Sequence, residues 1–191
     1  MDRARAHVLL FTGHRVDDPG RGTPRFPPDK VEVARQEIGA AIDALLARHG
    51  KGLIGIAGAA SGGDILFHEE CHARGIETTV YLALPEKEYA EQSVDSAGAE
   101  WTRRYYALLK KTPVRVLDPS AADGTNETVW TRSNLWMLRD ALANGSERVT
   151  LIALWDGKAG DGPGGTEHMV KEIERRGGEV VRIGAGTVFS D

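Results

Sequence analysis

The first place where this chain could do chemistry is a glycine-rich turn between an apolar run and a helix-like segment. The turn is Gly58-Ala59-Ala60-Ser61-Gly62-Gly63-Asp64, and the apolar run before it is Leu53–Ala57. Backbone N–H groups at the N-terminus of a helix attract anions. Glycines let a ligand approach that backbone and allow the positive φ values of the turn. The segment predicts a pocket for a nucleotide phosphate, with ligand contacts from Gly58, Ser61, Gly62, Gly63 and Asp64.

The spacing of this turn differs from two common nucleotide motifs. It matches neither G-x-G-x-x-G nor G-x-x-x-x-G-K-[ST], because no Lys-Ser or Lys-Thr pair follows Gly63. This argues against an ordinary dehydrogenase and against a P-loop kinase. Asp64 could accept hydrogen bonds from a ribose, or it could only stabilise the positive end of the helix. Ser61 could contact a phosphate, or it could only cap the helix.

A second group of candidate residues follows the first apolar run, residues 8–12. Gly13-His14-Arg15 leaves this run and opens a segment rich in Pro, Gly and Arg that extends to Pro28. Arginine presents a planar, permanently charged fork to phosphate, and a histidine beside it could donate a hydrogen bond or act as acid or base. We therefore expect Gly13, His14 and Arg15 to contact the ligand. A surface arginine beside a structural histidine is the alternative.

A competing motif lies in the helix-like segment after the turn. His68-Glu69-Glu70-Cys71-His72 satisfies H-E-x-x-H, in which two histidines one helical turn apart bind zinc and the glutamate activates water. This helix begins in the glycine-rich turn and leads into an apolar strand, so one of its faces must pack on a sheet. A zinc peptidase built on His68, Glu69 and His72 is therefore an alternative, and the leading interpretation expects no metal or cofactor.

Apolar runs and helix-like segments alternate along the chain. Strands are expected over 8–12, 53–57, 78–84, 114–117, 148–155 and 179–183, and helices over 29–49, 62–73, 101–110, 126–143 and 166–176. This alternation predicts one Rossmann-like α/β domain, residues 1–191, with a doubly wound, mainly parallel sheet and helices on both faces. The segments 13–28, 58–63 and 156–165 all follow strands, so we expect them at the sheet edge where such folds bind ligands.

Composition limits the possible partners. The chain has 191 residues, of which 41% are hydrophobic and 27% charged, and its formal net charge is -4. These values are ordinary for a globular domain, and they argue against broad binding to nucleic acid or to an anionic membrane. No apolar run approaches the length of a membrane helix. The single cysteine, Cys71, excludes an internal disulfide and predicts a cytoplasmic location.

These segments together resemble the SLOG superfamily of Rossmann-like domains, which includes DprA/Smf proteins, YpsA-like proteins and the LOG phosphoribohydrolases. The resemblance rests on Phe11-Thr12-Gly13-His14-Arg15 and on the glycine-rich turn, which is similar to the YpsA-like pattern S-G-x-A-x-G-x-D. A later part resembles the LOG pattern of an arginine-bearing helix, an apolar strand and P-G-G-x-G-T-x-x-E. Its counterparts here are Trp130-Thr131-Arg132-Ser133-Asn134, Leu151–Trp155 and Pro163-Gly164-Gly165-Thr166.

The resemblance implies roles for particular residues. Arg132 stands at the position of the LOG catalytic arginine, and phosphate contacts are implied for Gly164, Gly165 and Thr166. The chain departs from the pattern because two residues are missing between Gly165 and Thr166, and Met169 stands where the pattern has glutamate. Glu167 is acidic but lies at another phase of the helix.

The missing glutamate decides the order of the functional hypotheses. In LOG enzymes it serves cleavage of the N-glycosidic bond, so the resemblance implies binding more directly than hydrolysis. The leading expectation is a module that binds or senses a nucleotide or nucleotide-derived ligand, without a nucleic-acid or membrane partner. A LOG-like nucleotide phosphoribohydrolase that uses Arg132 is the second hypothesis, and the zinc peptidase is the third. Related SLOG proteins often pair, which implies a possible homodimer.

Overall fold

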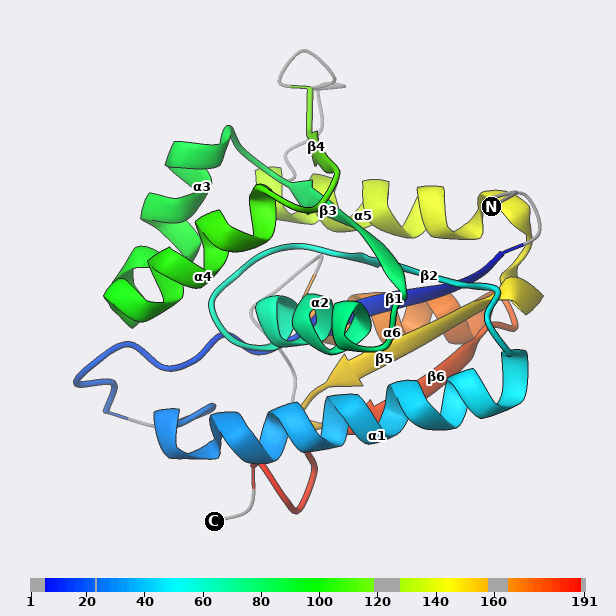
Figure 1. The fold of residues 1–191 in the computed structure, drawn as a ribbon, viewed down its shortest axis with the longest axis horizontal. Helices are drawn as coiled ribbons and strands as arrows, with labels where there is room; N and C mark the ends of the chain where they lie inside the picture. The colour runs from blue at the N-terminus through cyan, green and yellow to red at the C-terminus, as the bar shows by residue number, and fades with distance from the viewer. Residues whose placement is uncertain (1–5, 23, 119–127, 158–164, 190–191) are drawn as a thin grey trace.

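The computed structural model describes residues 6–22, 24–118, 128–157 and 165–189. Within these ranges the strands form a six-stranded sheet in the order β4-β3-β2-β1-β5-β6, and every neighbouring pair is parallel. The strands are β1 (His7–Gly13), β2 (Leu53–Ala57), β3 (Glu77–Leu82), β4 (Val114–Val116), β5 (Val149–Leu154) and β6 (Glu179–Ile183). Helices cover both faces of the sheet (Figure 1). The predicted doubly wound, Rossmann-like α/β fold is confirmed.

The helices alternate with the strands as the sequence predicts, except that two helices lie between β3 and β4. They are α1 (Val31–His49), α2 (Gly63–Ala73), α3 (Glu86–Ser93), α4 (Ala99–Leu109), α5 (Val129–Ala141) and α6 (Thr166–Arg175). Helix α3 was not predicted, because it is polar and buries only Tyr89, Ala90 and Ser93. No helix among the described residues is both long enough and apolar enough to cross a membrane.

Strand order fixes where the chain reverses direction across the sheet. From β1 the chain adds β2, β3 and β4 on one side, and it then returns to place β5 on the other side of β1. Adjacent crossover connections diverge at such a point, which leaves a crevice beyond the carboxyl ends of the two central strands. The segments that follow β1 and β5 therefore border this crevice.

Alternating side chains of the central strands feed two hydrophobic layers. Leu9 and Phe11 of β1 belong to the layer that includes residues of α1 and α2. Val8 and Leu10 belong to the opposite layer, with residues of α5 and α6. Both faces of the central strands are thus buried, which explains their nearly continuous apolar sequence and holds the carboxyl ends of the strands in place.

Candidate functional site

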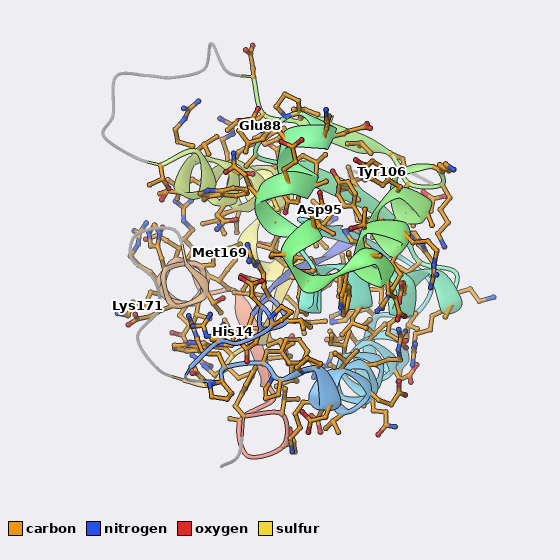
Figure 2. The ribbon with its side chains drawn as sticks, turned by 90° about the vertical axis from the view of Figure 1, so that its left-hand side faces the viewer. His14, Glu88, Asp95, Tyr106, Met169 and Lys171 are labelled. Atoms are coloured by element: carbon orange, nitrogen blue, oxygen red, sulfur yellow. The ribbon has the colours of Figure 1, made fainter. Side chains whose placement is uncertain are left out.

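A cavity of about 620 Å³ lies at the carboxyl edge of the sheet. This volume is in the range of small-molecule binding sites. Its wall is built from the ends of β1 and β5, the glycine-rich turn after β2, and helices α3, α5 and α6. Figure 2 looks onto this edge, with His14 between α6, which carries Met169 and Lys171, and the α3 side, which carries Glu88. The cavity occupies the crevice that the strand order predicts.

Three arginines of the segment after β1 line one part of the cavity: Arg15, Arg21 and Arg25. The carboxylate of Asp17 organises this segment, because one of its oxygens accepts hydrogen bonds from the backbone N–H groups of Arg25 (2.8 Å) and Phe26 (2.9 Å). Arg21 lies 3.4 Å from the other oxygen. The segment after β1 therefore brings three guanidinium groups to the cavity wall, together with the carboxylates of Asp17 and Asp18.

His14 lies between this segment and the end of β5. Arg25 Nη2 lies 3.3 Å from His14 Nδ1, and His14 Nε2 lies 3.4 Å from a carboxylate oxygen of Asp156. Because a guanidinium can only donate, Nδ1 accepts and Nε2 carries the proton that faces Asp156. The ring is only 10% exposed. His14 thus links the arginine segment to the loop that follows β5, and it also lines the cavity.

The glycine-rich turn uses its backbone N–H groups within the protein. Ser61 N–H donates to the carbonyl of Ser93 (3.0 Å), and Gly63 N–H donates to the carbonyl of His14 (3.2 Å). Ala59 N–H donates to Tyr89 Oη (3.1 Å), and Ala60 N–H donates to Asp64 Oδ2 (3.2 Å). These four donors are engaged in the turn's contacts with its neighbours, so the turn mainly joins α2 to the segment after β1 and to α3.

Gly62 is the point at which the turn meets the segment after β1. Arg15 and Gly62 form an isolated antiparallel bridge, and Gly62 has φ +117° and ψ −127°. A Cβ at this position would lie 2.7 Å from the backbone nitrogen of Val16. Glycine is therefore required both by backbone conformation and by the close approach of a second backbone segment.

Asp64 and Tyr89 face the cavity from two sides of Gly58. A Cβ on Gly58 would lie 2.6 Å from Asp64 Oδ2 and 3.1 Å from Tyr89 Oη. Burial raises the pKa of the Asp64 carboxyl to about 7, although the hydrogen bond from Ala60 lowers it in part. A cavity carboxyl with a pKa near neutrality is a common property of functional sites. Burial also raises the pKa of the Tyr89 hydroxyl, so this side chain stays protonated.

Aromatic and polar side chains of β3, of α5 and of the residue that follows β5 form another part of the wall. Tyr81, Trp130, Met137 and Trp155 contribute apolar surface, and Ser133 and Asn134 contribute polar groups. The four residues of α5 recur at helical spacing and so share one helix face. Arg115 bonds to Tyr81 Oη (2.8 Å) and to Asp140 (2.5 Å). This cluster fixes the Tyr81 ring against α5.

The structure brings together most, but not all, of the residues singled out in the sequence. Gly13, His14, Arg15, Gly58, Asp64, Gly165 and Thr166 line the cavity. Ser61, Gly62 and Gly63 lie behind its wall, and Ser61 Oγ donates to the carbonyl of Ser93 (3.2 Å). Gly164 lies outside the described residues. Arg132 is on α5 but is not among the residues that line the cavity, whereas Trp130, Ser133 and Asn134 are.

Helix α6 begins at the cavity, and its first turn shows the consequence of the departure from the LOG pattern. Thr166 Oγ1 lies 3.2 Å from Thr12 Oγ1, which ties the start of α6 to β1. Met169 is 2% exposed and packs in the layer beneath the sheet. Glu167 pairs with Lys171 (2.5 Å). The position that carries glutamate in LOG enzymes is thus a core position here.

The H-E-x-x-H motif is used for internal contacts. His68 is fully buried; its Nε2 lies 2.9 Å from the carbonyl oxygen of Gly58, and its Nδ1 lies 2.8 Å from Thr78 Oγ1. A carbonyl can only accept, so Nε2 carries a proton and cannot bind a metal in this arrangement. Glu69 pairs with Arg35 (2.8 Å) and Arg104 (2.7 Å). Among the described residues no group of three candidate metal ligands occurs, and the zinc geometry is not formed.

Sequence reasoning missed several residues of the wall, above all Tyr89, Gln92 and Ser93 of α3. The signal available was weak, because a short polar helix carries no strong periodicity. Arg15 Nη1 donates to the carbonyl of Gln92 (2.9 Å), which places α3 against the arginine segment. The segment 130–134 of α5 was recognised as similar to the LOG helix motif. Arg132 was predicted from it as the ligand contact, whereas Ser133 and Asn134 line the cavity.

Comparisons with known proteins give a similarity of fold. No protein-family model matches the chain, and no curated protein matches it. The structure of DNA processing protein A (DprA) from Streptococcus pneumoniae is similar, with a TM-score of 0.50 and 13% sequence identity. The match covers 96% of this chain and 52% of DprA, so the chain spans about half of that protein's length. At this identity the similarity shows the fold.

Proposed function

We propose that this is a SLOG-like domain whose cavity binds a nucleotide or nucleotide derivative, and that the domain binds or senses this ligand without cleaving it. The observation that carries the proposal is the composition of the cavity wall, with arginines on one part and aromatic rings on another. Arginine forks pair well with phosphate oxygens. Aromatic rings offer apolar surface on which a base can stack. A nucleotide has both parts in one molecule.

The phosphate contacts in this proposal come mainly from side chains. The N–H groups of Ala59, Ala60, Ser61 and Gly63 are engaged within the protein, so Arg15 and Arg25 are the better candidates. The N-terminus of α6 begins at the cavity with Gly165 and Thr166, and the dipole of a helix favours an anion there. The DprA-like fold supports a ligand at this edge only by analogy of architecture.

Two observations favour binding over hydrolysis. Met169 occupies the position of the LOG glutamate and is buried in the core. Arg132 does not line the cavity. A hydrolase of the LOG kind would therefore lack its implied glutamate, and its implied arginine is not among the residues that line the cavity. We propose a ligand-binding role on this basis.

Calorimetric titration with a panel of small molecules tests the proposal. The panel contains AMP, ADP, cyclic AMP, NAD⁺ and ribose 5-phosphate, and a short single-stranded DNA is measured in parallel. Arg15→Ala and Arg25→Ala are each expected to weaken nucleotide binding about 10- to 100-fold, because each removes charge-assisted hydrogen bonds worth about 1.5–3 kcal/mol. Arg48→Ala is the matched control, since Arg48 pairs with Glu179 at the other end of β6; its affinity should equal that of the unmodified protein.

Each alternative gives a different result. Release of free base during incubation, detected by chromatography, would support the phosphoribohydrolase and contradict the binding role. Binding of DNA without binding of any nucleotide would assign a nucleic-acid partner instead. If no panel member binds at millimolar concentration, the proposed nucleotide site is wrong.

A further inference from the structure

Asp64 is a carboxyl group in the cavity wall without a cationic partner. Its Oδ2 accepts a hydrogen bond from Ala60 N–H (3.2 Å), and among the described residues no arginine, lysine or histidine forms an ion pair with it. A Cβ on Gly58 would meet both Asp64 Oδ2 and the hydroxyl of Tyr89, so these two groups lie beside Gly58. A carboxylate placed in this way loses hydration without gaining a cationic side chain, and only the Ala60 N–H and the N-terminus of α2 offset that loss.

The charged groups that face the same cavity are directed to other partners. Arg15 bonds to the carbonyl of Gln92 (2.9 Å) and lies 3.6 Å from Asp18. Arg21 lies against Asp17, and Arg25 lies against His14. The α5 and α6 residues of the wall are uncharged, and α3 contributes Tyr89, Gln92 and Ser93. The wall residues from α3, α5 and α6 are therefore neutral, and the arginines are paired with other groups. Asp17 and Asp18 line the same cavity and add negative charge to it.

An anionic ligand makes the ionised form of Asp64 still less favourable. Burial already raises the pKa of this carboxyl to about 7. A phosphate bound by the arginines would place a second negative charge in the same cavity, and like charges disfavour ionisation further. The protonated carboxyl has a hydrogen-bond donor instead, which can be offered to a ligand oxygen or ring nitrogen.

We propose that Asp64 contacts the anionic ligand as a neutral carboxylic acid that donates its O–H, so that ligand binding takes up one proton. The proposal rests on the proposed nucleotide site. It differs from the role expected from the sequence, in which an ionised Asp64 accepts hydrogen bonds from a ribose. The two roles predict opposite effects of pH, because the acid form weakens binding as pH rises and the ionised form strengthens it.

The test measures proton uptake by calorimetry at pH 8 in buffers of different ionisation enthalpy. The probe is the panel member above that binds most tightly; at this pH its phosphates are fully ionised, since their second pKa is about 6. Uptake of close to one proton per bound molecule is expected. Between pH 7.5 and 9 the dissociation constant should rise about tenfold per pH unit, the slope of a single linked proton.

Matched variants identify the group that binds the proton. Asp64→Asn keeps a donor in place, so it should bind the probe at pH 8 with proton uptake near zero and without the pH slope. Asp64→Ser, a smaller neutral replacement, should also show no uptake. Asp43→Asn changes an exposed aspartate that pairs with Arg74, and it should retain the full uptake.

The outcomes separate this inference from the proposed function. If no panel member binds, both fail together. If a nucleotide binds with no proton uptake, with proton release, or more tightly at higher pH, the nucleotide site stands and the donor role of Asp64 is refuted. Uptake that persists in both Asp64 variants would assign the proton to another group, which also refutes it.

Discussion

Replacement of Gly62 by alanine is expected to destabilise the protein strongly, by about 3–5 kcal/mol. The backbone at Gly62 has φ +117° and ψ −127°, a conformation that costs a residue with a Cβ about 1–3 kcal/mol. The new Cβ would also lie 2.7 Å from Val16 N and 3.0 Å from His14 O. Both neighbours are backbone atoms, so the two segments must separate.

Separation of the two segments sets the rest of the magnitude. The hydrogen bonds from Val16 N–H to Ser61 O (2.9 Å) and from Gly63 N–H to His14 O (3.2 Å) join them. Each such bond contributes about 1 kcal/mol, so about 2 kcal/mol is added to the cost of backbone strain. Arg15 lies between His14 and Val16, and Arg25 belongs to the same segment. Displacement of this segment should therefore also weaken nucleotide binding.

Urea denaturation compares Gly62→Ala with Gly50→Ala. Gly50 ends α1 with φ +70° and ψ −157°, and a Cβ there would meet no atom within 4 Å. The control therefore carries backbone strain without a clash or lost hydrogen bonds, and its cost should be smaller by about 2 kcal/mol. Equal losses of unfolding free energy in the two variants would refute the view that the glycine-rich turn is a structural joint.

Two further predictions concern the dependence of stability on pH. The pKa of Asp64 is raised from 3.8 to about 7 in the folded protein, so its contribution to stability is present at low pH and is lost as pH rises through this range; at pH 8, Asp64→Asn should be more stable than the unmodified protein by up to about 4 kcal/mol in urea denaturation. An equal difference at pH 4 and pH 8 would contradict this. Burial lowers the pKa of His68 from 6.5 to about 4, so unfolding becomes easier as pH falls from 6.5 to 4; His68→Gln should show a weaker loss over that interval, and an unchanged slope would contradict the buried, neutral histidine.

The architecture could be predicted because it rests on local patterns. The runs 53–57 and 179–183 were predicted with the boundaries that β2 and β6 have. Strand β2 is a nearly continuous apolar segment, as expected for a buried parallel strand. Helix α3 was missed because few of its residues are buried. That omission removed Tyr89 from the predicted site.

The candidate site was predicted in part, for a related reason. Residues at or shortly after the carboxyl ends of strands, such as Gly13, Arg15 and Asp64, were found because these ends share one edge of a parallel sheet. Arg132 was taken from a short motif, and a motif does not state which face of a helix turns to the cavity. Trp130 and Asn134 lie in the same motif and line the wall instead.

The sequence by itself determined the alternation of strands and helices, the position of the glycine-rich turn and the edge at which a ligand could bind. Tertiary structure decided which of these groups remain available to a ligand. The N–H of Ser61 bonds to the carbonyl of Ser93, and the ring of His68 bonds to Gly58 and Thr78. The physical reason is that periodicity and turn chemistry act over a few residues, whereas hydrogen bonding and desolvation depend on partners that only the fold brings together.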